Sequence, residues 1–160
     1  MRHTVLMLAV LALPLAAACG DDGHHHDDGE GHLFCQGDEE VLTTGMSKLG
    51  DSGLFKVHLL DWAPDPLLVG NNSFTIEVTD DQDVPVDGIT FDTLETWQRV
   101  HDHGTPVVAV VTAGANVGEW QVDDMNVIHT GSWLFRFGPN DGTNSDFIEF
   151  NFGIECPPDP

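Results

Sequence analysis

Apolar and polar residues alternate along several short stretches of this chain. In residues 55–59 and 74–78 every second side chain is apolar, and Ile148, Phe150, Phe152 and Ile154 repeat the pattern near the C-terminus. Because neighbouring side chains of a strand point to opposite faces, a period of two predicts strands with one buried face. Seven stretches are expected to be strands: 55–59, 74–78, 88–94, 107–112, 118–122, 132–137 and 147–154.

Turn-forming residues separate these stretches. Asp-Asp-Gln-Asp at 80–83 and Pro-Asn-Asp-Gly at 139–142 favour turns, and the prolines of 64–66 interrupt regular structure. Apolar residues nowhere recur convincingly with the helical period of 3.6 residues, although residues 45–50 or 94–100 are compatible with a short turn of helix. About seven short strands separated by turns are typical of an immunoglobulin-like sandwich. We therefore predict an all-β fold, a two-sheet antiparallel sandwich of that kind.

The N-terminal segment has the features of an export signal. Residues 5–18 are apolar, broken only by Pro14, and end in small residues directly before Cys19. The run is too short to span a bilayer but suits a signal peptide. Small residues followed by cysteine resemble a bacterial lipobox, which predicts a signal peptide at 1–18 and a lipid on Cys19. The alternative is simple Ala-x-Ala cleavage that leaves Cys19 unmodified.

The lipid predicts a protein anchored in the bacterial cell envelope on the periplasmic side, and Gly20 slightly favours the outer membrane. Residues 20–32 have no apolar side chain, so we expect a flexible tether at 19–34 and one folded domain at 35–160. Histidines and carboxylates on a mobile tether can capture divalent cations weakly; the alternative is a solvated spacer. The tether histidines are His24, His25, His26 and His32.

The charge balance excludes one class of partner. The chain has 27 acidic and 5 basic residues, a formal net charge of −22. Nucleic acids and anionic lipid headgroups require lysine and arginine patches, so we expect neither as a partner. The expected partners are the membrane, reached through the lipid on Cys19, and an envelope protein.

Two cysteines besides Cys19 stand at the two ends of the predicted domain. Disulfides persist in exported proteins, so Cys35 and Cys156 are expected to form a bridge that holds the termini together. Two free thiols or a thiolate metal site are the alternatives at this point.

The candidate chemistry lies in a histidine pair. His101 and His103 are two residues apart and would share one face of a strand, where two imidazoles can chelate copper, zinc or nickel. His129 or Met125 is the candidate further ligand. The alternative is a polar loop whose side chains bond backbone groups and water. We expect no enzyme, because no Gly-x-Ser-x-Gly motif and no glycine-rich phosphate loop is present.

A series of short motifs between residues 53 and 137 resembles the YtkA-like domain family and the related FixH-like proteins. Each motif is weak alone, and their order carries the resemblance. They are Phe-Lys-Val-His-Leu at 55–59, Pro-Asp-Pro at 64–66, Gly-Asn-Asn-Ser-Phe-Thr-Ile at 70–76, Pro-Val-Asp-Gly at 85–88, His-Asp-His-Gly at 101–104, Gly-Glu-Trp at 118–120 and His-Thr-Gly-Ser-Trp-Leu-Phe at 129–135.

The resemblance implies a small exported β-sandwich, often lipid-anchored, without established catalysis and linked to copper handling. The chain departs from the family at two positions where a methionine is common. Residues 97–99 hold no methionine before the His-x-His, and His129 replaces the other methionine. These departures count against a methionine-rich copper(I) site. The resulting hypothesis is metal binding or delivery, copper first and zinc second; the alternative is a metal-free accessory module of an envelope complex.

Overall fold

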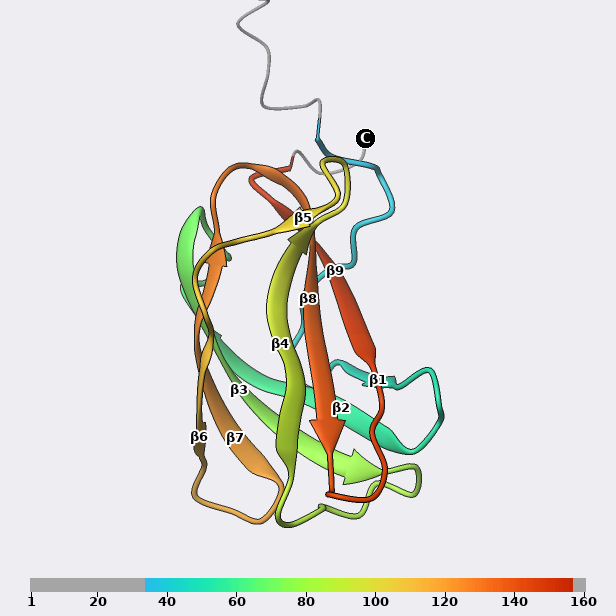
Figure 1. Cartoon of the computed structure of the whole chain (residues 1–160). Helices are drawn as coiled ribbons and strands as arrows, with labels where there is room; N and C mark the ends of the chain where they lie inside the picture. The colour runs from blue at the N-terminus through green and yellow to red at the C-terminus, as the bar shows by residue number, and fades with distance from the viewer. Residues whose placement is uncertain (1–33, 157–160) are drawn as a thin grey trace, which may run out of the picture.

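Nine antiparallel strands form two facing sheets in the part of the chain that the structure, a computed structural model, describes: residues 34–156 (Figure 1). The first sheet has the order β1 (Ser47–Leu49), β2 (Phe55–Ala63), β3 (Gly70–Asp80), β7 (Glu119–Val127) and β6 (Val110–Ala113). The second has the order β5 (His103–Gly104), β4 (Thr90–Gln98), β8 (Gly131–Asn140) and β9 (Ile148–Ile154).

The strand order is that of an immunoglobulin-like sandwich. Strands β2, β3, β7 and β6 take the A-B-E-D positions of such a fold, and β5, β4, β8 and β9 take the C′-C-F-G positions. Strand β1 is an addition at the edge of the first sheet beside β2. The predicted all-β, two-sheet antiparallel sandwich is therefore confirmed.

The seven expected stretches overlap β2, β3, β4, β6, β7, β8 and β9, while the two shortest strands were not expected. The helical turns considered at 45–50 and 94–100 are wrong. Ser47–Leu49 pairs with β2 as β1, and Leu94 to Gln98 pairs with β8 as part of β4. Pairing with a neighbouring strand outweighs the weak local preference at both places.

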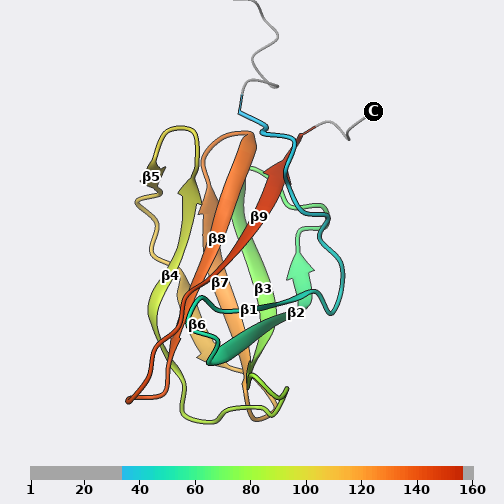
Figure 2. The ribbon, with the colours of Figure 1, turned by 90° about the vertical axis from the view of Figure 1, so that its right-hand side faces the viewer.

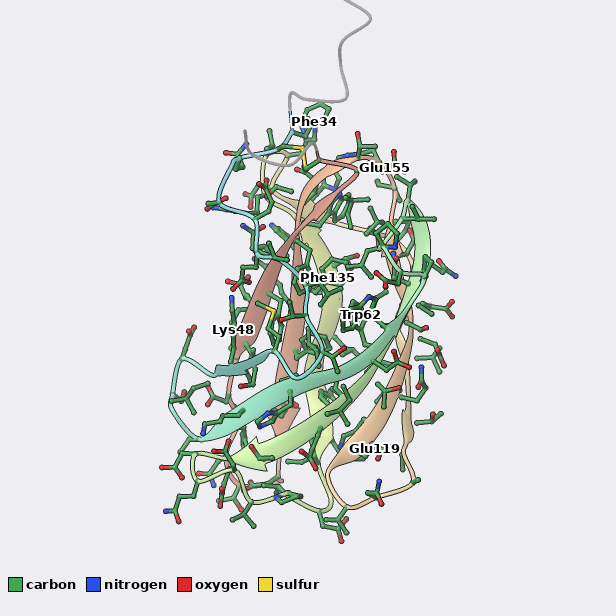
Figure 3. All side chains as sticks on the ribbon, turned by 180° about the vertical axis from the view of Figure 1, so that it is seen from behind. Phe34, Lys48, Trp62, Glu119, Phe135 and Glu155 are labelled. Carbon is green, nitrogen blue, oxygen red and sulfur yellow. A yellow bond between two sulfur atoms is a disulfide. The ribbon has the colours of Figure 1, made fainter. Side chains whose placement is uncertain are left out.

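Aromatic side chains fill the space between the sheets. Phe74 of β3 packs edge-on against Phe135 of β8 with ring centroids 5.3 Å apart, and Figure 3 shows Phe135 between the two sheets. The four apolar residues of β9 that alternate in the sequence are all buried, as the pattern predicts. Trp133 is fully buried, whereas Trp97 lies on the outer face, where Arg136 covers its ring at 4.6 Å.

The segment before β1 lies along the second sheet. We call residues 34–42 the N-terminal strap; it runs beside β9 (Figure 2), and the Glu40 amide donates to the Asn151 carbonyl at 2.7 Å. A disulfide joins Cys35 in the strap to Cys156 after β9, as predicted, with 5.9 Å between the Cα atoms. No helix within residues 34–156 is long and apolar enough to cross a bilayer.

Candidate functional site

Three histidines meet at the end of the sandwich where β4 and β7 end. His101 lies in the turn after β4, His103 begins β5, and His129 lies in the loop between β7 and β8. The rings of His101 and His103 are stacked, with centroids 5.8 Å apart. The ring of His129 stands edge-on to His101 at 5.6 Å. The structure therefore brings together three of the four residues expected to form the site in the domain.

A tight turn, not a strand, puts His101 and His103 on the same side. Residues 99–102 form the turn, and Asp102 has a left-handed backbone with φ of 53°. The side-chain carbonyl of Gln98 accepts the His101 amide at 2.7 Å, and the Trp97 indole donates to the Asp102 carboxylate at 3.3 Å. These two bonds hold the turn from β4.

The imidazole hydrogen bonds show which ring nitrogen carries a hydrogen in two of the rings. Nδ1 of His103 lies 3.0 Å from the Gly104 carbonyl oxygen, and Nδ1 of His129 lies 2.9 Å from that of Thr130. A carbonyl oxygen only accepts, so Nδ1 carries the hydrogen in both rings. In the neutral ring Nε2 is then left with its lone pair. Metal-binding histidines commonly have this arrangement, with one nitrogen free and the other bonded to a backbone carbonyl.

Two residues that the sequence did not single out complete the surroundings. The Phe34 ring lies 4.9 Å from that of His101 and 5.5 Å from that of His129, and Figure 3 shows Phe34 at the same end as the disulfide. Gln98 is fully buried, and its Nε2 has no hydrogen-bond partner among residues 34–156. The inward alternation of Leu94, Thr96 and Gln98 along β4 is the one sequence signal that marks Gln98 as a buried polar group.

The other predicted ligands lie elsewhere. Met125, with 1% of its surface exposed, belongs to the hydrophobic core. It points inward from β7, because the strand alternates buried and half-buried residues there. The structure thus groups His129, and not Met125, with the histidine pair. The predicted tether histidines His24, His25, His26 and His32 lie outside the described residues, as do Cys19 and the predicted signal peptide.

The three imidazoles do not form a closed coordination shell. Within residues 34–156, the only three histidine, cysteine or carboxylate donors that lie within 4.8 Å of one another belong to Cys35, Glu39 and Cys156. Because those two sulfurs are joined in the disulfide, neither is a thiolate ligand. A shared ion would therefore need a rotation of the histidine side chains. His101 and His103 are exposed and have room for it, whereas His129 is half-buried.

Basic side chains of the described domain are all engaged in ion pairs. Arg99 binds both carboxylate oxygens of Asp38 at 2.8 and 2.9 Å, and this hydrogen bonding holds the pKa of Asp38 below its usual value. Lys48 pairs with Glu40 at 2.6 Å, and Arg136 with Glu149 at 2.6 Å. The first two pairs and Glu149 line a groove of about 500 Å³ on the outer face of the second sheet. The fourth, Lys56, pairs with Asp83 at 2.8 Å.

No protein-family model, curated protein or solved structure matches the chain. The resemblance to the YtkA-like and FixH-like families stays a prediction from the sequence motifs.

Proposed function

We propose that the domain binds a transition-metal ion, copper before zinc, through His101, His103 and His129, and that it holds or delivers this ion. The observation that carries the proposal is the convergence of three imidazoles from two separate loops. In two of them Nδ1 donates its hydrogen bond to a backbone carbonyl, so that Nε2 is available to bind a metal. In the cellular setting proposed with it, the protein is held in the bacterial envelope by a lipid on Cys19.

The donor chemistry favours copper(II) or zinc. Neutral imidazole suits both ions, and three histidines with an open position form a site that accepts a ligand from outside. Asp102, in the turn between the paired histidines, can add an oxygen donor if it releases the Trp97 indole. A site that must turn its rings to close binds more weakly than a preformed one, because part of the binding energy is used for reorganisation. Such a site suits transient holding and transfer.

The tether enters the domain at this end of the molecule. Phe34, which contacts two of the three rings, follows His32 by two residues in the sequence. Two residues of chain span at most about 7 Å, so His32 is within covalent reach of the Phe34 end of the domain. We infer that ions captured by the tether are passed to His101, His103 and His129.

Metal titration of the chain lacking residues 20–32 tests the proposal. We expect stoichiometric copper or zinc binding that weakens at least about tenfold in His101→Ala and in His103→Ala, because each change removes one ligand of a shared ion. Affinity should also fall as the pH is lowered, since protons compete with metal for imidazole. Isothermal calorimetry at two pH values measures both effects.

His58→Ala is the matched control, because it removes an imidazole of β2 whose Nε2 bonds Thr79 at 3.0 Å. The metal affinity of His58→Ala should equal that of the parent chain. If the parent chain binds no metal, or if His58→Ala weakens binding as much as His101→Ala, the site is not there. The metal-free accessory module then becomes the better interpretation.

A further inference from the structure

Strand β4 has an unoccupied neighbour position along most of its length. Strand β5 pairs with β4 only at Trp97↔Gly104 and Gln98↔His103. The chain then passes Thr105 and Pro106 and crosses to the first sheet, where it forms β6. Within the described residues, β4 from Thr90 to Thr96 is therefore paired with β8 on one side and with no strand on the other. In sandwiches of this order the C′ strand can flank strand C, and here it stops after two residues.

A groove of about 410 Å³ occupies this position. One wall is β4 from Phe91 to Glu95, and the other is formed by Val108 and Ala109 of the crossing segment and by Val111 of β6. Phe91 and Leu94 are only half-buried although they pack against the core. The hydrophobic core thus reaches the surface where a strand is missing.

The segment that crosses beside this groove has little of the usual protection of strand edges, and β4 itself is interrupted by one bulge, between Phe91 and Thr93. Residues 104–118 contain no charged side chain, in a chain with a net charge of −22. Val108 is 82% exposed and Val110 49% exposed. Natural proteins normally place lysines, prolines or bulges on such edges to prevent strand addition. Inside β6 there is neither a charge nor a proline.

We propose that this groove is a docking site for an extended segment of a partner protein, which adds as a strand beside β4. The segment would carry apolar side chains at every second position, which enter the groove, and basic or uncharged polar side chains between them. Unpaired N–H and C=O groups along β4 require an extended backbone as occupant, because only a strand can satisfy them in series. The proposal is independent of the metal site.

The net charge of the chain disfavours a second copy of it as the partner. Among the described residues, Asp92 and Glu95 are the only charged ones that line the groove, and both are carboxylates. An approaching copy would bring a further net charge of −22. Lysine or arginine side chains on the outer face of an added strand would instead lie opposite Glu95, with Asp92 nearby at the bulge of β4, and opposite charges across a strand pair are stabilising.

The probe is a synthetic peptide of about ten residues in which valine and lysine alternate, long enough to span β4. Amide hydrogen exchange of the full chain is followed by nuclear magnetic resonance with and without the peptide. We expect saturable binding and at least about tenfold slower exchange at alternate amides between Thr90 and Thr96, because new ladder bonds form there. The turn at 80–83 should be unchanged.

Val108→Asp should weaken binding of the peptide at least about tenfold. Val117→Asp is the matched control. Val117 is also exposed, at 58%, and it lies outside the groove, so both variants add the same charge. A peptide with the valines and lysines in two separate blocks controls for charge alone. Equal binding of the block peptide, equal loss in both variants, or the absence of binding at millimolar peptide would overturn the proposal. A dimer of the free chain that protects the β4 amides would overturn the choice of a foreign partner.

Discussion

One buried carboxylate organises the turn between the first two strands. Asp146, 6% exposed, accepts the backbone amides of Ser52 and Leu54 at 2.8 Å and of Phe55 at 3.1 Å. It sits before β9, so it ties the β1–β2 turn to the opposite sheet. Gly50 makes this approach possible, because a Cβ there would lie 2.2 Å from the Asp146 carboxyl carbon. The turn therefore depends on a carboxylate at one position and on a glycine at the other.

The ionisation of Asp146 links stability to pH. Burial raises the pKa of Asp146, but the backbone amides that it accepts, including that of Phe147, outweigh burial and hold the pKa below the ordinary value. A carboxyl group with a lowered folded pKa stabilises the fold fully above its unfolded pKa of about 3.9. That contribution is lost as the pH falls through the folded value.

Asp146→Asn should lower the free energy of unfolding by about 2 kcal/mol at pH near 7, because an amide nitrogen replaces one acceptor among the backbone donors. The difference from the parent chain should shrink well below pH of about 4, where the parent carboxyl is itself protonated. Urea unfolding at the two pH values measures this. Asp81→Asn is the control, since Asp81 is an exposed turn residue and loses the same charge. An equal loss at both pH values would show that the charge of Asp146 is unimportant.

At the scale of single residues, the sequence predicted which histidines approach one another but not how. The spacing of His101 and His103 indicated one strand face, and the structure reaches the same side through a turn with Asp102 in a left-handed conformation. His129 and Met125 are separated by only a few residues, and only the register of β7 decides that the methionine is buried. The contact of Phe34 with two of the rings depends on where the strap is held, which no local pattern encodes.

Among the elements, the N-terminal strap extends the second sheet without being a strand. The side-chain amide of Asn151 donates to the Asp38 carbonyl at 3.1 Å, and its backbone amide donates to the Glu40 carboxylate at 2.8 Å. Asn151 also accepts the Ser132 hydroxyl at 3.0 Å. Through this one residue the strap, β8 and β9 are joined.

Asn151→Ala should release the strap and leave the sheets intact, because the backbone pairing of β8 with β9 does not use the side chain. We expect the Glu40 amide, which donates to the Asn151 carbonyl, to exchange at least about tenfold faster with solvent. Amides of β8 should keep their rates. Asn144→Ala, in an exposed turn, is the control. If the Glu40 amide stays as protected as in the parent chain, the disulfide, the ion pairs Arg99–Asp38 and Lys48–Glu40 and the backbone bonds hold the strap without the Asn151 side chain.

Strand length explains which elements the sequence could predict. The seven expected stretches contain several alternating apolar residues, and each of them lies largely or partly in a strand. Strands β1 and β5, with three and two residues, are too short to show a period of two. These two short strands form because a neighbouring strand has backbone N–H and C=O groups available for pairing. The same fact leaves β4 open beyond β5, so the docking groove could not be found from the sequence either.

At the scale of the whole molecule, one covalent link closes the sandwich. The disulfide joins residues 121 positions apart, so it connects the strap at the start of the domain to the segment after its last strand. Cross-linking so long a loop removes a large part of the freedom of the unfolded chain. The link also lies beside Phe34, at the end of the molecule where the three histidines meet.

Replacing both cysteines, as Cys35→Ser with Cys156→Ser, should lower the free energy of unfolding by about 4 to 5 kcal/mol in the chain-entropy model. Urea unfolding of the double variant against the parent chain measures the loss, and the parent chain under reducing conditions is the control for the serine side chains. The folded variant should keep its strand pairing, because the bridge lies outside β1 and β9. A loss below about 1 kcal/mol would mean that the unfolded chain is already compact. The hydrogen bonds of the strap would then be what holds the two ends together.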